Sequence, residues 1–262
     1  NTIRFLLGNI SDFNPETDAV EFSEEDRYSL DAWAMAELAK FIRETVEAYS
    51  VFQYKLANEI IFRFCYDTLS AVYLAATKDR LYCERSGSRK RRRSQTAMYR
   101  ITDALVKLLA PILVHTADEA YLSLKGLPPD SKESVHLAGL PEAVDIPVDP
   151  AWDEVLELRG RVLKALEEAK EAQGISNPLD AGVEVTVDGG LYKKLKPFEP
   201  ELPDIAGVSR FEILEGKEVR IKIVDLSGEP RCERSWKRDG TVKERPGGGL
   251  LSDRDAEALD VD

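Results

Sequence analysis

The chain has 262 residues and a net charge of −12, a length that fits one large domain or two ordinary ones. Its 43% hydrophobic content can fill a packed core, and its apolar runs are shorter than the roughly 20 residues of a bilayer-spanning helix. The acidic balance excludes a protein that coats nucleic acid nonspecifically, but it allows a shaped nucleic-acid partner approached through a local basic cluster.

The cysteines and the first residues of the chain predict where the protein resides. Cys65, Cys83 and Cys232 are odd in number and far apart, which favours a reducing cytoplasm over a disulfide framework. No basic stretch precedes the short apolar run at the start, so we expect no signal peptide. Because the chain begins with Asn, we expect a fragment of a longer protein. We expect a cytoplasmic monomer without membrane contacts.

Helical periodicity dominates the first 145 residues. Four helical segments are predicted there: 1–13, 23–48, 56–77 and 94–108. Residues 78–82 are expected to turn, so that the run 89–93 precedes the fourth helix. Pro111 should end that helix, and the capping-box spacing of Thr116 and Glu119 predicts a restart there. Several amphipathic helices with short loops indicate a helical bundle.

The second half of the chain changes character after a linker with five prolines at 126–150. A helix is predicted over 153–172, followed by period-two strands at 183–187 and 219–223 and a third candidate at 211–214. We therefore predict a mainly α protein: a helical-bundle domain over 1–145, a small α+β domain over 146–226, and a polar tail over 227–262.

One stretch reverses the charge of the chain. Residues 78–100 hold nine Lys or Arg against two acids, a net of +7, while the remainder carries −19. Such a reversal is typical of a polyanion site. A phosphate role for the run Arg89–Arg93 is favoured over a solvated run or a patch for an acidic protein. The flanking Tyr82 and Tyr99 offer rings for base stacking, although Tyr99 equally suits a core.

Signals for catalysis are poor. The sequence has no glycine-rich phosphate loop after a strand and no nucleophile elbow. His115 and His136 lack partners at metal-ligand spacing. Asp253 and Asp255 are expected to form a solvated acidic end. We expect no catalytic site in this chain.

Several segments resemble the anticodon-binding region of isoleucyl-tRNA synthetases. These are NTIRFLLGNISDF at 1–13, DTLSAVYL with KDRLY at 67–82, SQT at 94–96, and LLAPIL with TADE at 108–119. The resemblance covers nearly the whole chain and is strongest through residue 124. Valyl and leucyl enzymes share the helical domain more loosely, and KDRLY favours isoleucine. The same domain of a valyl-type enzyme is the alternative within this class.

The resemblance implies a parent ligase that activates isoleucine with ATP and magnesium and charges its tRNA. The HIGH and KMSKS motifs and the editing domain are absent from this chain, so the chain is expected to be inactive alone. Its implied partners are isoleucine tRNA and the parent's catalytic domain. Basic side chains would hold phosphates, and unstacked anticodon bases would supply specificity. The residues expected to contact tRNA are Arg4, Lys78, Arg80, Arg89, Lys90, Arg91, Arg92, Arg93 and Trp236. The competing hypothesis is a protein-interaction scaffold that binds an acidic partner.

The tail departs from the family, whose bacterial-type members often end in a zinc knuckle with two CxxC pairs. Cys232 is retained, whereas Ser235, Ser252 and Asp255 stand at the other three ligand positions. One thiolate cannot hold a tetrahedral zinc ion and serine is a poor ligand, so we expect no zinc and no other cofactor in this chain. We expect a metal-free tail anchored by its apolar side chains, with a mobile glycine loop. The anchors are Trp236, Leu250, Leu251 and Leu259, and the loop is 247–249.

Overall fold

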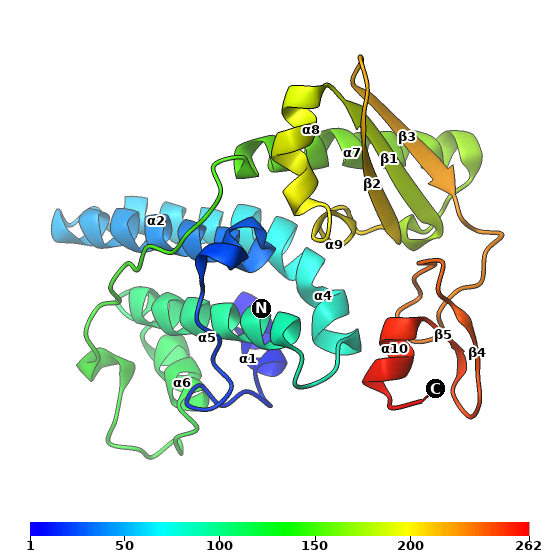
Figure 1. Ribbon diagram of the computed structural model, residues 1–262. Coiled ribbons are helices and arrows are strands. Elements are labelled where there is room, and N and C mark those ends of the chain that lie inside the picture. The colour runs from blue at the N-terminus through cyan, green and yellow to red at the C-terminus, as the bar shows by residue number, and fades with distance from the viewer. Residues whose placement is uncertain (262) are drawn as a thin grey trace. The chain divides into compact units, whose positions relative to one another are not determined.

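The computed structural model describes residues 1–261. By their internal contacts these residues form two compact units. Unit 1 comprises 1–27, 31–74 and 92–148, and unit 2 comprises 28–30, 75–91 and the chain from Asp149 onward. The segment 75–91, placed in the first domain by the sequence, groups with unit 2, as does the tail. The predicted fold class is confirmed: helices predominate, and a small α+β part follows the helical part (Figure 1).

The first part of the chain is built from helices. They are α1 (Thr2–Asn9), the 3₁₀ helix η1 (Glu24–Tyr28), α2 (Leu30–Ser50), α3 (Tyr54–Arg63), the π-helix η2 (Phe64–Tyr73), α4 (Leu74–Cys83), α5 (Arg89–Leu109), α6 (Val114–Leu124) and the 3₁₀ helix η3 (Val135–Leu137). In unit 1, Leu6, Leu69 and Leu105 are fully buried, and Phe41 of α2 stacks on Phe64 at 4.2 Å between ring centroids. Helix α5 ends before Pro111, as predicted.

Several helix boundaries differ from the predictions. Helix α1 ends at Asn9 instead of at 13, and α2 begins at Leu30, after the 3₁₀ helix η1, instead of at 23. Helix α4 continues through residues 78–82 instead of turning there. Helix α5 begins at Arg89 and not near Ser94; the Ser88 hydroxyl caps it by accepting a bond from the Arg91 amide at 3.2 Å. Helix α6 begins at Val114, before the expected capping box at Thr116. The errors at α4 and α5 both involve arginines. Arg80 of α4 occupies a buried position, where a charged residue is rare, and Arg89 begins α5, where the helix dipole favours acidic residues.

Unit 2 contains a three-stranded sheet, a long helix and several short elements. They are α7 (Trp152–Gln173), the 3₁₀ helix η4 (Pro178–Asp180), β1 (Ala181–Val187), α8 (Gly189–Leu195), the 3₁₀ helix η5 (Lys196–Phe198), α9 (Leu202–Ala206), β2 (Arg210–Glu215), β3 (Arg220–Asp225), β4 (Lys243–Arg245), β5 (Gly249–Leu251) and α10 (Asp253–Ala258). The strand order is β2-β1-β3, with β1 parallel to β2 and antiparallel to β3. Helix α7 packs against the sheet and α8 lies beside β2 (Figure 1). All three predicted strands are present.

The tail folds around a small core of its own. Cys232, Leu251 and Ala256 are buried, with Val242 and Val261 packed against them. The prediction that Trp236 anchors the tail is wrong, because its side chain is 53% exposed. Of the predicted leucine anchors, only Leu251 is buried. Of the predicted glycine loop 247–249, Gly247 and Gly248 lie in the β4–β5 turn and Gly249 begins β5; Gly247 and Gly249 adopt a positive φ of 75°.

Within residues 1–261, none of the helices combines the length and the apolar character that crossing a membrane requires.

Candidate nucleic-acid interface

Three of the basic side chains predicted to contact tRNA are exposed. Arg4 is exposed on α1, Lys78 is exposed on α4, and Arg89 is exposed at the start of α5. Within the described chain, Arg4 and Lys78 form no ion pair. Their charges therefore remain available to a polyanion.

Arg80, by contrast, is fully buried in unit 2. Its Nη2 donates to Oε2 of Glu201 at 2.8 Å and to Oδ2 of Asp204 at 2.9 Å. Burial alone would raise the pKa of Asp204, but Arg80, Lys237 and Lys90 outweigh burial and hold that pKa well below its usual value. The predicted tRNA contact at Arg80 is therefore wrong, because the guanidinium has no surface to offer.

Lys90 and Arg91 also have partners within unit 2. The Lys90 ammonium lies 3.0 Å from Oδ2 of Asp204 and remains about one-third exposed. Arg91 donates from Nε to the Leu81 carbonyl at 3.0 Å and from Nη1 to the Ser86 carbonyl at 3.2 Å. Arg91 thus satisfies backbone acceptors at the end of α4. Both side chains hold the segment between α4 and α5 in place.

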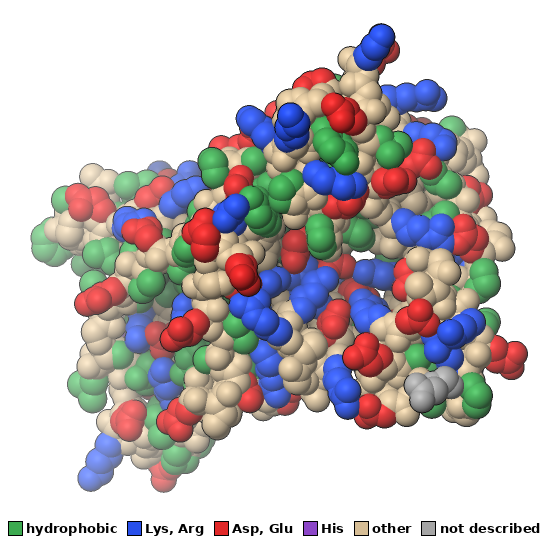
Figure 2. Space-filling view, in the orientation of Figure 1, with side chains coloured by type: hydrophobic (Ala, Val, Ile, Leu, Met, Phe, Trp, Pro, Cys, Tyr) green, Lys and Arg blue, Asp and Glu red, His purple; other side chains and the backbone are tan. Residues whose placement is uncertain are grey.

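The last two members of the run belong to unit 1. Arg92 is half-buried, and its Nη1 lies 3.4 Å from Oδ2 of Asp18 and donates to Gln95 at 2.8 Å. Arg93 is buried and donates to Asp26 and Asp31, at 2.9 Å each. The predicted tRNA contact at Arg93 is wrong for the same reason as at Arg80. Figure 2 shows that Lys and Arg side chains at the surface are interspersed with Asp and Glu.

A pocket of about 470 Å³ in unit 2 brings together two of the predicted residues, Lys78 and Trp236. Tyr82 lines it as well, and its ring is 59% exposed. The other lining residues are Ala75, Ala76, Asp79, Cys83, Leu179, Pro203, Asp204, Gly207, Val208, Arg234, Ser235 and Lys237. Two exposed aromatic rings and a free ammonium group beside an apolar wall suit a planar base with a phosphate attached.

The turn that carries Trp236 is unusual. Trp236 has a positive φ of 63°, a backbone conformation that costs a non-glycine residue on the order of 1 kcal/mol and is enriched at functional sites. The turn is closed by the Trp236 amide donating to the Cys232 carbonyl at 2.9 Å. The Arg231 guanidinium lies 5.2 Å from the centre of the indole ring, a cation–π contact. An exposed indole is therefore held in a fixed orientation at the pocket.

The thiol and the buried lysine of this pocket are poorly suited to act as nucleophiles. Its one thiol, Cys83, has a pKa raised to about 11, first by burial and then by Asp79 and Asp255, so it is not a nucleophilic thiolate at neutral pH. Lys237 is paired with Asp204 at 2.8 Å and with Asp79 at 3.0 Å. Burial would lower the pKa of Lys237, but these carboxylates outweigh burial and raise it.

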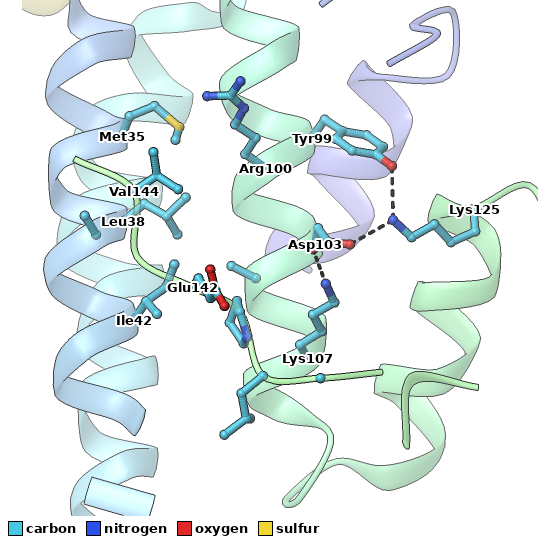
Figure 3. Close-up of a pocket in the computed structure, with 15 residues that line it drawn as sticks. Met35, Leu38, Ile42, Tyr99, Arg100, Asp103, Lys107, Lys125, Glu142 and Val144 are labelled. Atoms are coloured by element: carbon cyan, nitrogen blue, oxygen red, sulfur yellow. Dashed lines mark hydrogen bonds and ion pairs between the residues drawn. The ribbon is translucent and has the colours of Figure 1, made fainter. Parts of the chain in front are cut away.

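A second pocket, of about 600 Å³, lies in unit 1 between α2 and α5 (Figure 3). Leu38 and Ile42 form its apolar wall, and Asp103 lies on the polar wall. Burial would raise the pKa of Asp103, but Lys107 at 2.6 Å and Lys125 at 2.9 Å lower it. Arg100, Lys107 and Lys125 outnumber the carboxylates of Asp103 and Glu142 by one, but none of the predicted tRNA contacts lines this pocket. It is a weaker candidate for a polyanion.

The sequence prediction named Trp236 but missed the basic tail residues that line the same pocket, Arg234 and Lys237. Arg231, Arg234 and Lys237 surround Trp236 in the stretch RCERSWKR. The signal was present, since basic residues interleaved with an aromatic residue are typical of RNA-binding segments. The resemblance of the same stretch to a metal module concealed it.

Comparisons with known proteins identify the family of this chain. Residues 31–186 match the family model described as the anticodon-binding domain of tRNA ligase. The chain is 40% identical over 250 residues to isoleucine–tRNA ligase of Laribacter hongkongensis, an alignment that covers 93% of this chain and 25% of that protein. It is 38% identical to isoleucine–tRNA ligase of Carboxydothermus hydrogenoformans, covering 90% of this chain and 26% of that protein.

The corresponding enzyme of Symbiobacterium thermophilum is 35% identical, covering 94% of this chain and 28% of the enzyme. The chain thus spans about a quarter of the length of the curated relatives it matches. The family model covers more than half of the chain and includes α2 to α6. By this match, the chain belongs to the family of anticodon-binding domains of tRNA ligases.

Proposed function

We propose that this chain binds the anticodon stem-loop of isoleucine tRNA, as one part of an isoleucine–tRNA ligase. The whole protein would activate isoleucine with ATP and magnesium in the cytoplasm, and the chain would bind its tRNA as a monomer. The observation that carries the proposal is the pocket in unit 2, where Lys78, Tyr82 and Trp236 meet. An unstacked anticodon-loop base would enter this pocket and stack on an aromatic ring.

The exposed basic side chains have a different role in this proposal. Arg4 in unit 1, and Lys78 and Arg89 in unit 2, would contact phosphates and so position the RNA without reading its sequence. Lys90 and Arg92 would add weaker contacts, because carboxylates already neutralise them in part. Arg80, Arg91 and Arg93 would hold the fold.

The anticodon claim is tested by comparing isoleucine tRNA with the same tRNA carrying a swapped anticodon. Filter binding over a range of salt concentrations measures both affinities. Affinity for both RNAs should fall with salt because phosphate contacts release counterions. We expect the swapped anticodon to bind more weakly at every salt concentration, because the hydrogen bonds to the base edges change, whereas stacking alone tolerates any base. Equal affinities throughout would contradict the anticodon claim.

The role proposed for the pocket in unit 2 is tested by replacing Trp236. Trp236→Ala should weaken binding of isoleucine tRNA by about 1–3 kcal/mol, roughly 5- to 150-fold in Kd, because a base loses its stacking partner. Trp236→Phe should retain most of the affinity. Tyr66→Ala serves as the control, since Tyr66 is a similarly exposed aromatic residue in unit 1, 63% exposed, and does not line the pocket. An unchanged Kd for Trp236→Ala would remove the pocket from the proposal.

The scaffold hypothesis predicts no tRNA binding even at low salt. Its main support is the basic run, and most of that run is paired with carboxylates of this chain. An acidic protein partner would have to displace those pairs. The pocket would offer such a partner the ammonium group of Lys78, but its exposed Tyr82 and Trp236 suit an unstacked base, so RNA is the better-supported ligand.

A further inference from the structure

Asp255 is the centre of a buried polar cluster in the tail. Its side chain is fully buried, contrary to the predicted solvated acidic end. Oδ2 of Asp255 accepts hydrogen bonds from the Cys232 thiol at 3.2 Å, the Ser235 hydroxyl at 2.7 Å and the Ser252 hydroxyl at 2.8 Å. One carboxylate oxygen therefore gathers three side chains from two separate stretches of the tail.

Basic side chains complete the surroundings of this carboxylate. Nη2 of Arg254 lies 3.2 Å from Oδ2 of Asp255, and Nε of Arg234 lies 3.6 Å from Oδ1. Arg254 also pairs with Asp79 of α4. The negative charge of Asp255 is thus compensated, which a buried carboxylate requires.

By the resemblance of the tail to zinc knuckles, the four residues of the cluster stand at the four metal-ligand positions. They do not fit zinc, which takes four ligands, mostly thiolate and imidazole, at about 2.0–2.3 Å. Cys232 supplies the only thiol, and it donates its proton to Asp255. Two of the others are hydroxyls that donate to the same oxygen. Among residues 1–261, no group of three or more His, Cys, Asp or Glu is arranged to hold a metal ion.

We infer that the carboxylate of Asp255 replaces the metal in this tail. A zinc ion would hold four ligands together by coordination; here Asp255 holds Cys232, Ser235 and Ser252 by accepting their hydrogen bonds. The cluster closes the turn 232–237 onto the start of α10, because Ser252 is the N-cap of that helix. The turn that presents Trp236 is therefore held in place without a metal.

The first test compares two acidic residues of α10. Asp255→Ala should accelerate amide hydrogen exchange across residues 232–258, on the order of tenfold or more, because three buried donors lose their acceptor. Glu257→Ala is the matched control, since Glu257 is exposed on the same helix, and its exchange rates should match those of the unchanged chain. Equal exchange in both variants would overturn the inference. The readout requires no RNA and is independent of the proposed function.

The second test restores the ligands. A variant combining Ser235→Cys, Ser252→Cys and Asp255→Cys places four thiols at the four positions. It should bind one zinc or cobalt ion per chain, with the absorption of a tetrahedral cobalt–thiolate site, and chelation should then loosen the tail. The unchanged chain should contain no zinc after purification and should be insensitive to chelators. One zinc per unchanged chain, or a folded triple variant that does not bind cobalt, would refute the replacement.

Discussion

Replacing Arg80 by Ala is expected to lower the free energy of unfolding by about 3–5 kcal/mol, the usual cost of removing one partner of a buried ion pair. Arg80 is fully buried, and its two carboxylate partners, Glu201 and Asp204, are 8% and 7% exposed. Without the guanidinium, two buried carboxylates face each other with one cation fewer. Urea denaturation measures the loss, and hydrogen exchange should locate it in α4 and α9.

Two further variants separate this explanation from a general effect of mutation. Lys78→Ala removes the same charge from the same helix, but Lys78 is exposed, so its effect should stay within about 0.5 kcal/mol. Adding Glu201→Gln to Arg80→Ala should recover part of the lost stability, because one uncompensated charge disappears. If Arg80→Ala left stability unchanged and weakened tRNA binding instead, the burial of Arg80 would not describe the protein in solution.

The sequence could not reveal which basic side chains of residues 78–100 remain exposed. Counting charges along the chain finds the positive segment correctly, but it assigns no partners from distant segments. Arg80 meets Glu201 and Asp204, which lie 121 and 124 positions later. A local count of +7 therefore becomes a surface on which cations alternate with carboxylates. Which arginines remain exposed is a property of tertiary packing.

Local patterns, in contrast, were sufficient for most of the elements. Period two predicted β1 and β3, β2 was a third candidate strand, and Pro111 ended α5. The short elements α8, α9, β4 and β5 were missed, because each spans only three to seven residues, too few to show periodicity. The motifs that resemble the synthetase family led to the proposed function, which periodicity alone could not indicate.

In the tail, too, the sequence did not reveal which side chains are buried. The resemblance to zinc knuckles, with three of the four cysteines replaced, predicted a tail without zinc, and Trp236 was then chosen as the anchor by hydrophobicity. The structure buries Asp255 and exposes Trp236. A charged residue is a poor guess for a core position, because its burial requires the donors of Cys232, Ser235 and Ser252 to converge on it. Their convergence depends on the turn and the helix cap forming together.

Arg93→Ala is expected to have an effect as large as that of Arg80→Ala, about 3–5 kcal/mol in the free energy of unfolding, but in unit 1. Arg93 joins α5 to Asp26 and to Asp31 of α2. Asp31 is fully buried, and it also accepts from the Tyr73 hydroxyl and the Ser94 hydroxyl, both at 2.8 Å. Removing Arg93 takes from two buried carboxylates the cation that they share.

Arg93→Lys should recover only part of this loss, because one ammonium group cannot reproduce the forked guanidinium that donates to both carboxylates. Arg4→Ala is the control: it removes the same charge from an exposed position of unit 1 and should change stability by less than about 0.5 kcal/mol. Hydrogen exchange in α2 and α5 should report the Arg93 effect, and filter binding should report any effect of Arg4. A stable Arg93→Ala protein that bound tRNA poorly would contradict this explanation and indicate that Arg93 contacts the RNA. Removing a residue that holds the fold must lower the free energy of unfolding.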